Sequence, residues 1–325
     1  MKVLSLFDGM SCGRIALDRA GINVTSYHAS ELDKFAIKVT QANWPETVQL
    51  GDVTKWREWD IDWKSIDLLI GGSPCQGFSF AGKQLAFDDP RSKLFFVYVD
   101  ILNHIKTLNP NVKFMLENVR MKKEYLDIIS EQLGVDPVFI NSVLVSAQNR
   151  QRFYWANWKI EQPNDRGLLL AGIIDSGIID REKSFCIDAN YHKGGNLKSY
   201  FEKNRRQLVF ELSSINQRCI DITINDDGIR PHKGDARKSG ISELGRLVFK
   251  DAKKTYTVTT SHMPKIIDEL GYRKLTPIEC ERLQTVPDNY TNHTSNSQRY
   301  KMLGNGWTVD VISHIFKQGL KNDRF

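Results

Sequence analysis

The sequence predicts an α/β fold with a doubly wound, mixed but mostly parallel sheet and a smaller irregular domain. Over residues 1–159, short β-branched runs alternate with longer helical patterns, the element order of a doubly wound sheet. From about residue 170 the alternation stops and basic clusters appear. We therefore expect a sheet domain over 1–170, a separate small domain over 171–271 and a return to the sheet domain over 272–325.

Apolar periodicity places each element of the first domain. The expected strands are 3–7, 24–29, 66–70, 114–117, 139–145 and 152–155, and the expected helices are 13–20, 35–42, 94–105 and 125–133. In the return segment, Thr276-Pro277-Ile278-Glu279 combines a capping box with a proline in the first turn. This predicts a helix that starts there and ends before Pro287. A last helix is expected over 309–320.

Composition limits the class of protein. With 325 residues, of which 41% are hydrophobic, the chain can bury one large core and a small appendage. We expect a cytoplasmic protein with no membrane partner, since the sequence has neither a run of roughly 18 apolar residues nor an apolar leader. The five cysteines form no close-spaced pair, so we expect no disulfide framework and no metal site. The net charge of +6 weakly favours a polyanionic partner.

The first motif is a glycine-containing turn after the first strand, Phe7-Asp8-Gly9-Met10-Ser11-Cys12-Gly13. Glycines there let a ligand approach the backbone at the carboxyl end of a strand. Glu31 follows the second strand and can accept both hydroxyls of a ribose. Asp52, in Gly51-Asp52-Val53, follows a further short strand that ends before Gly51 and can accept an adenine amino group. Each also has a plainer interpretation, as a tight turn or a helix-capping acid. The sequence has no P-loop, which a phosphate-rich ligand would favour. The glycine-containing turn, Glu31 and Asp52 together therefore favour an adenosine ligand.

The second motif surrounds Cys75. A cysteine is most often a small buried apolar residue. This one follows a buried strand, in a turn formed by Gly71, Gly72 and Pro74, so we expect its sulfur to be exposed at the ligand-binding edge of the sheet. Zinc deaminases also contain Pro-Cys but need a second cysteine three positions later, where this chain has Phe78.

The third motif is the apolar strand that ends at Glu117. Its carboxylate caps the next turn or, if the strand lies near the one that leads to Cys75, shares a cleft with the thiol. Farther on, Gln148, Arg150 and Arg152 alternate along the chain, so strand periodicity puts them on one donor-rich face.

These residues suit methylation of cytosine at carbon 5. That carbon becomes nucleophilic once a thiolate adds to carbon 6, for which Cys75 is suited. Arg150 is a candidate for favouring the thiolate, and Glu117 can bond ring N3 and the exocyclic amine. The ring carbon then attacks a sulfonium methyl group, and loss of the C5 proton releases the thiol. No residue is identified as the base that takes this proton.

At this point the motifs resemble, in family order over about two thirds of the chain, those of the cytosine-5 DNA methyltransferases. The match continues with Arg282-Leu283-Gln284 and Gly304-Asn305-Gly306. The resemblance implies the fold of S-adenosylmethionine-dependent methyltransferases and a catalytic set of Cys75, Glu117, Arg150 and Arg152. It also implies that S-adenosylmethionine is held by Phe7, Asp8, Gly9, Ser11, Cys12, Gly13, Glu31, Leu32, Asp52, Val53, Ser73, Pro74, Leu94, Asn305, Gly306 and Trp307.

The same resemblance makes residues 171–271 a target-recognition domain for double-stranded DNA, with the target base flipped into the cleft. The expected DNA contacts are Gln76, Ser79, Gln148, Arg205, Arg206, Arg237, Lys238, Lys253 and Lys254. We expect a monomer on DNA in a bacterial or phage setting, such as restriction-modification.

The chain departs from the common family pattern at Ser11 and Cys12, where most members have glycines. These residues and Trp307 resemble the de novo methyltransferase subgroup, which however has asparagine at the place of Gln76. The tRNA methyltransferase branch remains an alternative, although its Cys-Phe-Thr element is absent before Arg282-Leu283-Gln284. A catalytically silent DNA-binding protein is a second alternative, against which the intact Cys75 argues.

Overall fold

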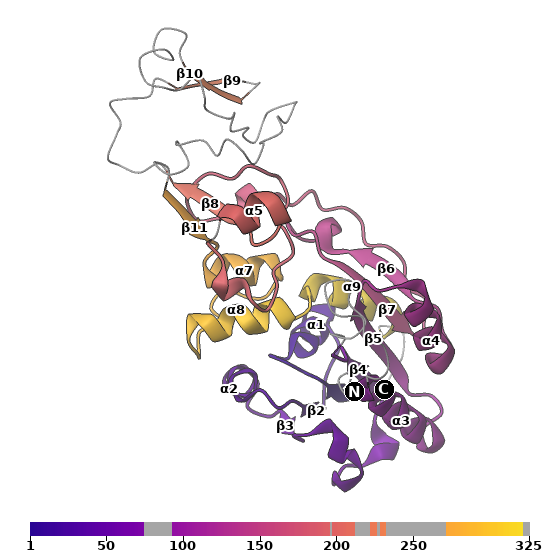
Figure 1. Cartoon of the computed structure of the whole chain (residues 1–325). Helices are drawn as coiled ribbons and strands as arrows, with labels where there is room; N and C mark the ends of the chain where they lie inside the picture. Colours follow the sequence, from indigo (N-terminus) through magenta and orange to yellow (C-terminus); the bar gives the residue numbers. More distant parts are fainter. Residues whose placement is uncertain (75–92, 196, 212–221, 226–227, 232–270, 321–325) are drawn as a thin grey trace.

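A seven-stranded sheet in the order β3-β2-β1-β4-β5-β7-β6 forms the centre of the molecule (Figure 1). The computed structural model describes residues 1–74, 93–195, 197–211, 222–225, 228–231 and 271–320. The strands of this sheet are β1 (Lys2–Leu6), β2 (Ser26–Ser30), β3 (Val48–Gln49), β4 (Leu68–Gly71), β5 (Lys113–Val119), β6 (Val138–Asn141) and β7 (Gln151–Ala156). Only β7 runs antiparallel to its neighbours, β5 and β6, so the predicted mostly parallel sheet is confirmed.

Helices cover both faces of this sheet. They are α1 (Cys12–Ala20), α2 (Lys34–Asn43), α3 (Lys93–Leu108), α4 (Lys123–Leu133), α7 (Pro277–Leu283), α8 (Asn296–Asn305) and α9 (Val309–Gly319). A further helix, α5 (Leu197–Lys203), packs instead against residues 208–210. Along β1, Val3 packs into a cluster with α1 and α9, whereas Leu4 packs into one with α3 and α4. This period of two follows from the pleat, and each such buried side chain contributes about 1.5–3 kcal/mol. None of the described helices is long and apolar enough to cross a membrane.

The chain changes direction between β1 and β4, which are neighbours in the sheet. From β1 it continues through α1 to β2, and from β4 through α3 to β5. Helices α1 and α3 pack on opposite faces of the sheet. Such a reversal opens a crevice at the carboxyl ends of the strands.

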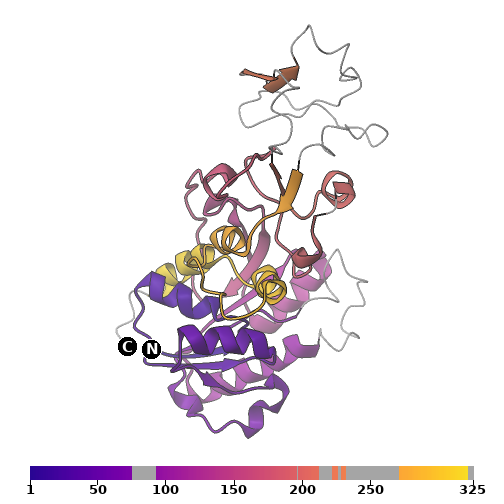
Figure 2. The same ribbon diagram turned by 90° about the vertical axis from the view of Figure 1, so that its left-hand side faces the viewer.

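A second, smaller layer lies beyond α7 and α8 (Figures 1 and 2). Here β8 (Leu208–Glu211) pairs antiparallel with β11 (Gly271–Lys274), next to α5. A separate pair joins β9 (Ile222–Asn225) and β10 (Gly228–Pro231). None of these elements was predicted from the sequence. Part of the region, including Tyr191, packs in the same hydrophobic cluster as α1 and α9, so it lies close against the sheet domain.

Two local differences from the expected elements have clear causes. The strand expected over 139–145 ends at Asn141, whose side chain accepts a hydrogen bond from the Val143 N–H at 3.3 Å and caps a short 3-10 helix, Ser142–Leu144. Helix α8 was not predicted, because few of its residues are apolar. The predicted capping box of α7 is confirmed: Thr276 Oγ1 accepts from the Glu279 N–H, and Glu279 Oε2 accepts from the Thr276 N–H.

Candidate active site

A cavity of about 660 Å³ lies at the carboxyl ends of β1, β2, β4 and β5, where the change of chain direction opens the crevice. This volume suits a small organic ligand. All residues that the sequence analysis assigned to a cofactor line this cavity, except Ser11 and Gly13. Glu117, Arg150 and Arg152 line it as well. The structure therefore brings the expected cofactor residues and the expected acid to one place.

The turn after β1 has an unusual backbone. Gly9 and Ser11 both have φ of 60°, a left-handed conformation that costs a residue with a side chain roughly 1–2 kcal/mol. The Asp8 carboxylate holds the turn: it accepts hydrogen bonds from the Tyr27 hydroxyl at 2.7 Å and from the Ser11 hydroxyl. Burial raises the pKa of Asp8 to about 6, against the opposing effect of these hydrogen bonds. We call Asp8, Ser11 and Tyr27 the turn cluster.

Glu31 is fixed by backbone donors. Its Oε2 accepts from the Gly9 N–H at 2.8 Å, and its Oε1 accepts from the N–H groups of Leu32 and Asp33 at 2.8 Å. Oε2 retains acceptor capacity for a ribose hydroxyl. Beside it, the Leu32 side chain lines the cavity although it is 70% exposed, which suits an apolar edge that a ligand would cover.

Asp52 caps the short 3-10 helix Val53–Glu58. Its Oδ1 accepts from the Thr54 N–H at 2.9 Å and from the Thr54 hydroxyl at 2.8 Å. The hydrogen bond from the Thr54 N–H and, to a smaller extent, the one from the Thr54 hydroxyl lower the pKa of Asp52. The Asp52 carboxyl group is therefore an anion at neutral pH. Its other oxygen remains available to an amino group, as the sequence analysis expected of an adenine contact.

The return segment closes the cavity beside the turn. A side chain at Gly306 would approach Cys12 Sγ to 3.1 Å, so this glycine allows the close approach of α8's end to α1. Cys12 is 3% exposed, and burial raises the pKa of its thiol to about 12. Cys12 is thus an unreactive packing thiol, which distinguishes it from the expected nucleophile.

Glu117 lies on β5 and is 8% exposed. Its Oε1 lies 2.7 Å from Arg152 Nε, and its Oε2 accepts a hydrogen bond from the Trp307 indole N–H at 3.1 Å. Pro74, which is covalently followed by Cys75, lines the same cavity. The remaining predicted site residues Cys75, Gln76, Ser79, Arg237, Lys238, Lys253 and Lys254 lie outside the described residues.

Gln148 requires a correction. It was expected on one strand face with Arg150 and Arg152, as a DNA contact, but β7 begins only at Gln151. Gln148 has no exposed surface. Its amide donates to Leu283 O at 3.3 Å and accepts from the Ile187 N–H at 2.8 Å. Because its amide is bonded to the backbone of Leu283 and Ile187, the Gln148 side chain holds these two segments together and is not available to DNA.

Arg150 is also buried, with 2% exposure. Its guanidinium donates to the carbonyls of Ile187, Gly304 and Gly306 at 3.0, 3.2 and 2.8 Å, and to Cys186 Sγ at 3.2 Å. Its expected effect on Cys75 stays a prediction.

The basic pair Arg205 and Arg206 lies near Asp188. Arg205 Nη2 is 2.6 Å from Asp188 Oδ2, and its side chain is half exposed. Asp188 itself lines the cavity, as do its neighbours from Cys186 to Asn190. This segment was not predicted to line the site, because its sequence has no apolar periodicity and no motif. The DNA contacts of the two arginines stay predictions.

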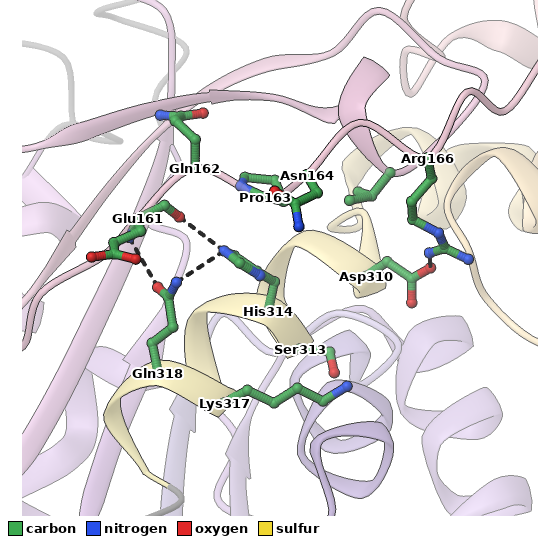
Figure 3. A pocket seen from close by; sticks show the side chains of 11 residues that line it. Glu161, Gln162, Pro163, Asn164, Arg166, Asp310, Ser313, His314, Lys317 and Gln318 are labelled. Carbon is green, nitrogen blue, oxygen red and sulfur yellow. Dashed lines mark hydrogen bonds and ion pairs between the residues drawn. The ribbon is translucent and has the colours of Figure 1, made fainter.

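A second hollow, of about 400 Å³, lies between residues 161–166 and α9 (Figure 3). Several of its polar groups bond one another: His314 Nε2 lies 2.8 Å from Glu161 O and 3.1 Å from Gln318 Nε2, and Arg166 pairs with Asp310. None of the predicted site residues that the structure describes lines it. Among the described residues, no group of three or more His, Cys, Asp or Glu side chains is placed to hold a metal ion.

The doubly wound sheet, with an acid-lined cavity at the carboxyl ends of its strands, defines a class, the α/β proteins with a ligand crevice at a sheet edge. Comparison with known proteins then identifies the family. Residues 1–321 match the family described as C-5 cytosine-specific DNA methylase, and the chain belongs to this family. The predicted family and enzyme class, a DNA (cytosine-5-)-methyltransferase that depends on S-adenosylmethionine, are thereby confirmed.

Individual relatives agree with this assignment. The chain is 30% identical to the type II methyltransferase M1.ScrFI of Lactococcus lactis subsp. cremoris over 98% of its own length and 78% of the relative. It is also 30% identical to M.HpaII of Haemophilus parainfluenzae, over 98% and 88% of the two chains. Among solved structures, the methyltransferase EhMeth of Entamoeba histolytica has the same fold, with a TM-score of 0.67 at 15% identity over 98% and 97% of the two chains.

Proposed function

We propose that this chain methylates carbon 5 of a flipped-out cytosine in double-stranded DNA through a covalent bond between Cys75 and carbon 6. One observation carries the proposal. Pro74, the residue before Cys75, and Glu117 line the same cavity as the residues suited to an adenosine ligand. A thiol, an acid and a cofactor pocket at one sheet edge are what this reaction requires.

The cofactor we propose is S-adenosylmethionine, which supplies an electrophilic methyl group when bound. The cavity residues fit it chemically. The Glu31 carboxylate, held by three backbone N–H groups, would accept from the ribose hydroxyls. Asp52 would accept from the adenine amino group, and Leu32 would cover an apolar edge. The turn after β1 lies at the cavity and lets the ligand approach the backbone.

The protein residues activate the base. The Cys75 thiolate adds to carbon 6, and its electron pair makes carbon 5 nucleophilic. The Glu117 carboxyl group bonds ring N3 and the exocyclic amine, which stabilises the charge that develops on the ring. After carbon 5 has been methylated, loss of its proton returns an electron pair to the ring and expels the thiolate. The cysteine is thereby regenerated.

The substrate reaches this cavity only as an extruded base, because a thiol cannot reach carbon 6 within stacked duplex DNA. The net charge of +6 supports binding to the phosphate backbone, which we expect to weaken with salt. Several relatives are named as type II methyltransferases of bacteria and two as orphan methyltransferases of Bacillus phages. We propose a similar cytoplasmic setting, with the protein acting as a monomer.

The test uses purified protein, methyl-labelled S-adenosylmethionine, and either unmethylated plasmid DNA or tRNA. We expect label in DNA, at cytosine carbon 5 by bisulfite sequencing. Duplexes that carry 5-fluorocytosine at the mapped site should trap a covalent complex. Label in tRNA alone would replace the DNA assignment with the tRNA branch of the family.

Cys75→Ser tests the nucleophile. It should abolish methyl transfer and trapping but retain DNA binding, because a hydroxyl is a much weaker nucleophile than a thiolate. Cys280→Ser is the matched control, since Cys280 is fully buried and does not line the cavity; it should remain active. Substantial turnover by Cys75→Ser would refute the covalent mechanism.

A further inference from the structure

Trp307 contacts several segments of the cavity wall. It follows α8 and lines the cavity, and its indole N–H donates to Glu117 Oε2 at 3.1 Å. Glu117 thus receives a hydrogen bond from the return segment, far away in sequence, in addition to its ion pair with Arg152 from the adjacent strand β7.

Gly72 makes room for the Trp307 ring, and a Cβ at Gly13 would lie in van der Waals contact with it. A side chain on Gly72 would place its Cβ 3.0 Å from both the indole nitrogen and Glu117 Oε2, and one on Gly13 would place it 3.4 Å from the indole ring. Gly72 lies just before Ser73-Pro74-Cys75, and Gly13 lies in the first turn of α1. The ring therefore lies between the segment that leads to Cys75, the first turn of α1 and strand β5, which carries Glu117.

This arrangement limits the orientations of the Glu117 carboxylate. Arg152 contacts one oxygen and the indole N–H contacts the other. The indole N–H can only donate a hydrogen bond. Because the ring is packed between these segments, it does not follow the Glu117 carboxylate when the carboxylate rotates. Donors fixed before the reaction need no reorganisation while charge develops on the base.

Resting on the proposed function, we propose that Trp307 is a positioning residue that orients the Glu117 carboxylate for the cytosine ring, and does more than form a wall of the cofactor pocket. Trp307→Phe separates the two roles, because it retains an aromatic ring but removes the donor. A wall residue would change the KM for S-adenosylmethionine, whereas a positioning residue would change kcat.

We expect Trp307→Phe to lower kcat about tenfold to a hundredfold, the value of a hydrogen bond to a charged group, with the KM for S-adenosylmethionine within about twofold. Trp158→Phe is the matched control: its indole N–H donates to Ile315 O at 3.1 Å and it does not line the cavity, so its kcat should equal that of the wild type. An unchanged kcat, or a rise in KM alone, for Trp307→Phe would overturn the proposal.

A spectroscopic experiment tests the contact without any turnover. With ¹⁵N-labelled tryptophan, the indole signal missing from Trp307→Phe is assigned to Trp307. In Glu117→Ala this signal should shift, while the Trp158 signal stays in place. An unshifted signal would overturn the positioning role even if the enzyme is active. Absence of DNA methylation by the wild type, in contrast, would refute the proposed function while leaving the indole contact itself measurable.

Discussion

Arg150 and Arg152 are separated by one residue but belong to different regions. Arg150, Gln148 and Gln284 form a buried hub, whose side chains bond mainly the backbone of segments distant in sequence. Both arginines line the cavity, but Arg152 pairs with Glu117 and has a partly exposed side chain, whereas Arg150 is buried. Both arginines belong to one sequence motif, residues 148–152, yet their surroundings in the structure differ. Polar side chains whose hydrogen bonds go to buried backbone groups stabilise the fold. Polar side chains that keep an exposed surface in the cavity remain available to a ligand.

The largest effect should follow from breaking the hub. Arg150→Met leaves the carbonyls of Ile187, Gly304 and Gly306 buried without their donor. We expect a loss of about 3–5 kcal/mol in the free energy of unfolding, measured by urea denaturation at neutral pH. If Arg150→Met is as stable as the wild type, the hub is not what holds these segments together.

The matching change in the cavity wall should mainly affect activity. Arg152→Met removes one contact of Glu117 but leaves the Trp307 N–H in place, next to a cavity that water can enter. We expect kcat to fall about tenfold to a hundredfold and the free energy of unfolding to fall by only about 1–2 kcal/mol. A stability loss equal to that of Arg150→Met would remove the distinction between the two regions.

The difference between the two arginines also shows what the sequence could predict. Strand ends and their acids were identified because apolar periodicity locates strands and parallel strands share one edge; Glu31, Asp52 and Glu117 accordingly line one cavity. Periodicity could not show that the strand begins only at Gln151, because the preceding residues are held by segments distant in sequence. The wall residues Cys186–Asn190 were missed for the same reason.

The cavity wall should respond to pH where the hub does not. Burial raises the pKa of Asp8 to about 6 in the folded protein, above its usual value near 4 in an unfolded chain. The folded state thus binds this proton more tightly, so stability should fall as pH rises from about 4 to about 6 and level off above. Asp8→Asn should remove this pH dependence, which we expect to amount to about 2–3 kcal/mol in the free energy of unfolding measured by urea denaturation. An unchanged slope would show that Asp8 is not its source.

The smallest effect separates hydrogen bonding from backbone strain within the turn cluster. Ser11 has a left-handed backbone, and its hydroxyl bonds Asp8 and lies 3.0 Å from Thr40 Oγ1. Ser11→Gly loses these contacts but relieves the strain, so its stability should stay within about 0.5 kcal/mol of the wild type. Ser11→Ala loses the contacts and keeps the strain, so it should be less stable than Ser11→Gly by about 1 kcal/mol. Equal stability of the two variants in thermal denaturation would mean that the turn relaxes when the hydroxyl is removed, and that hydrogen bonding to Asp8 maintains its left-handed form.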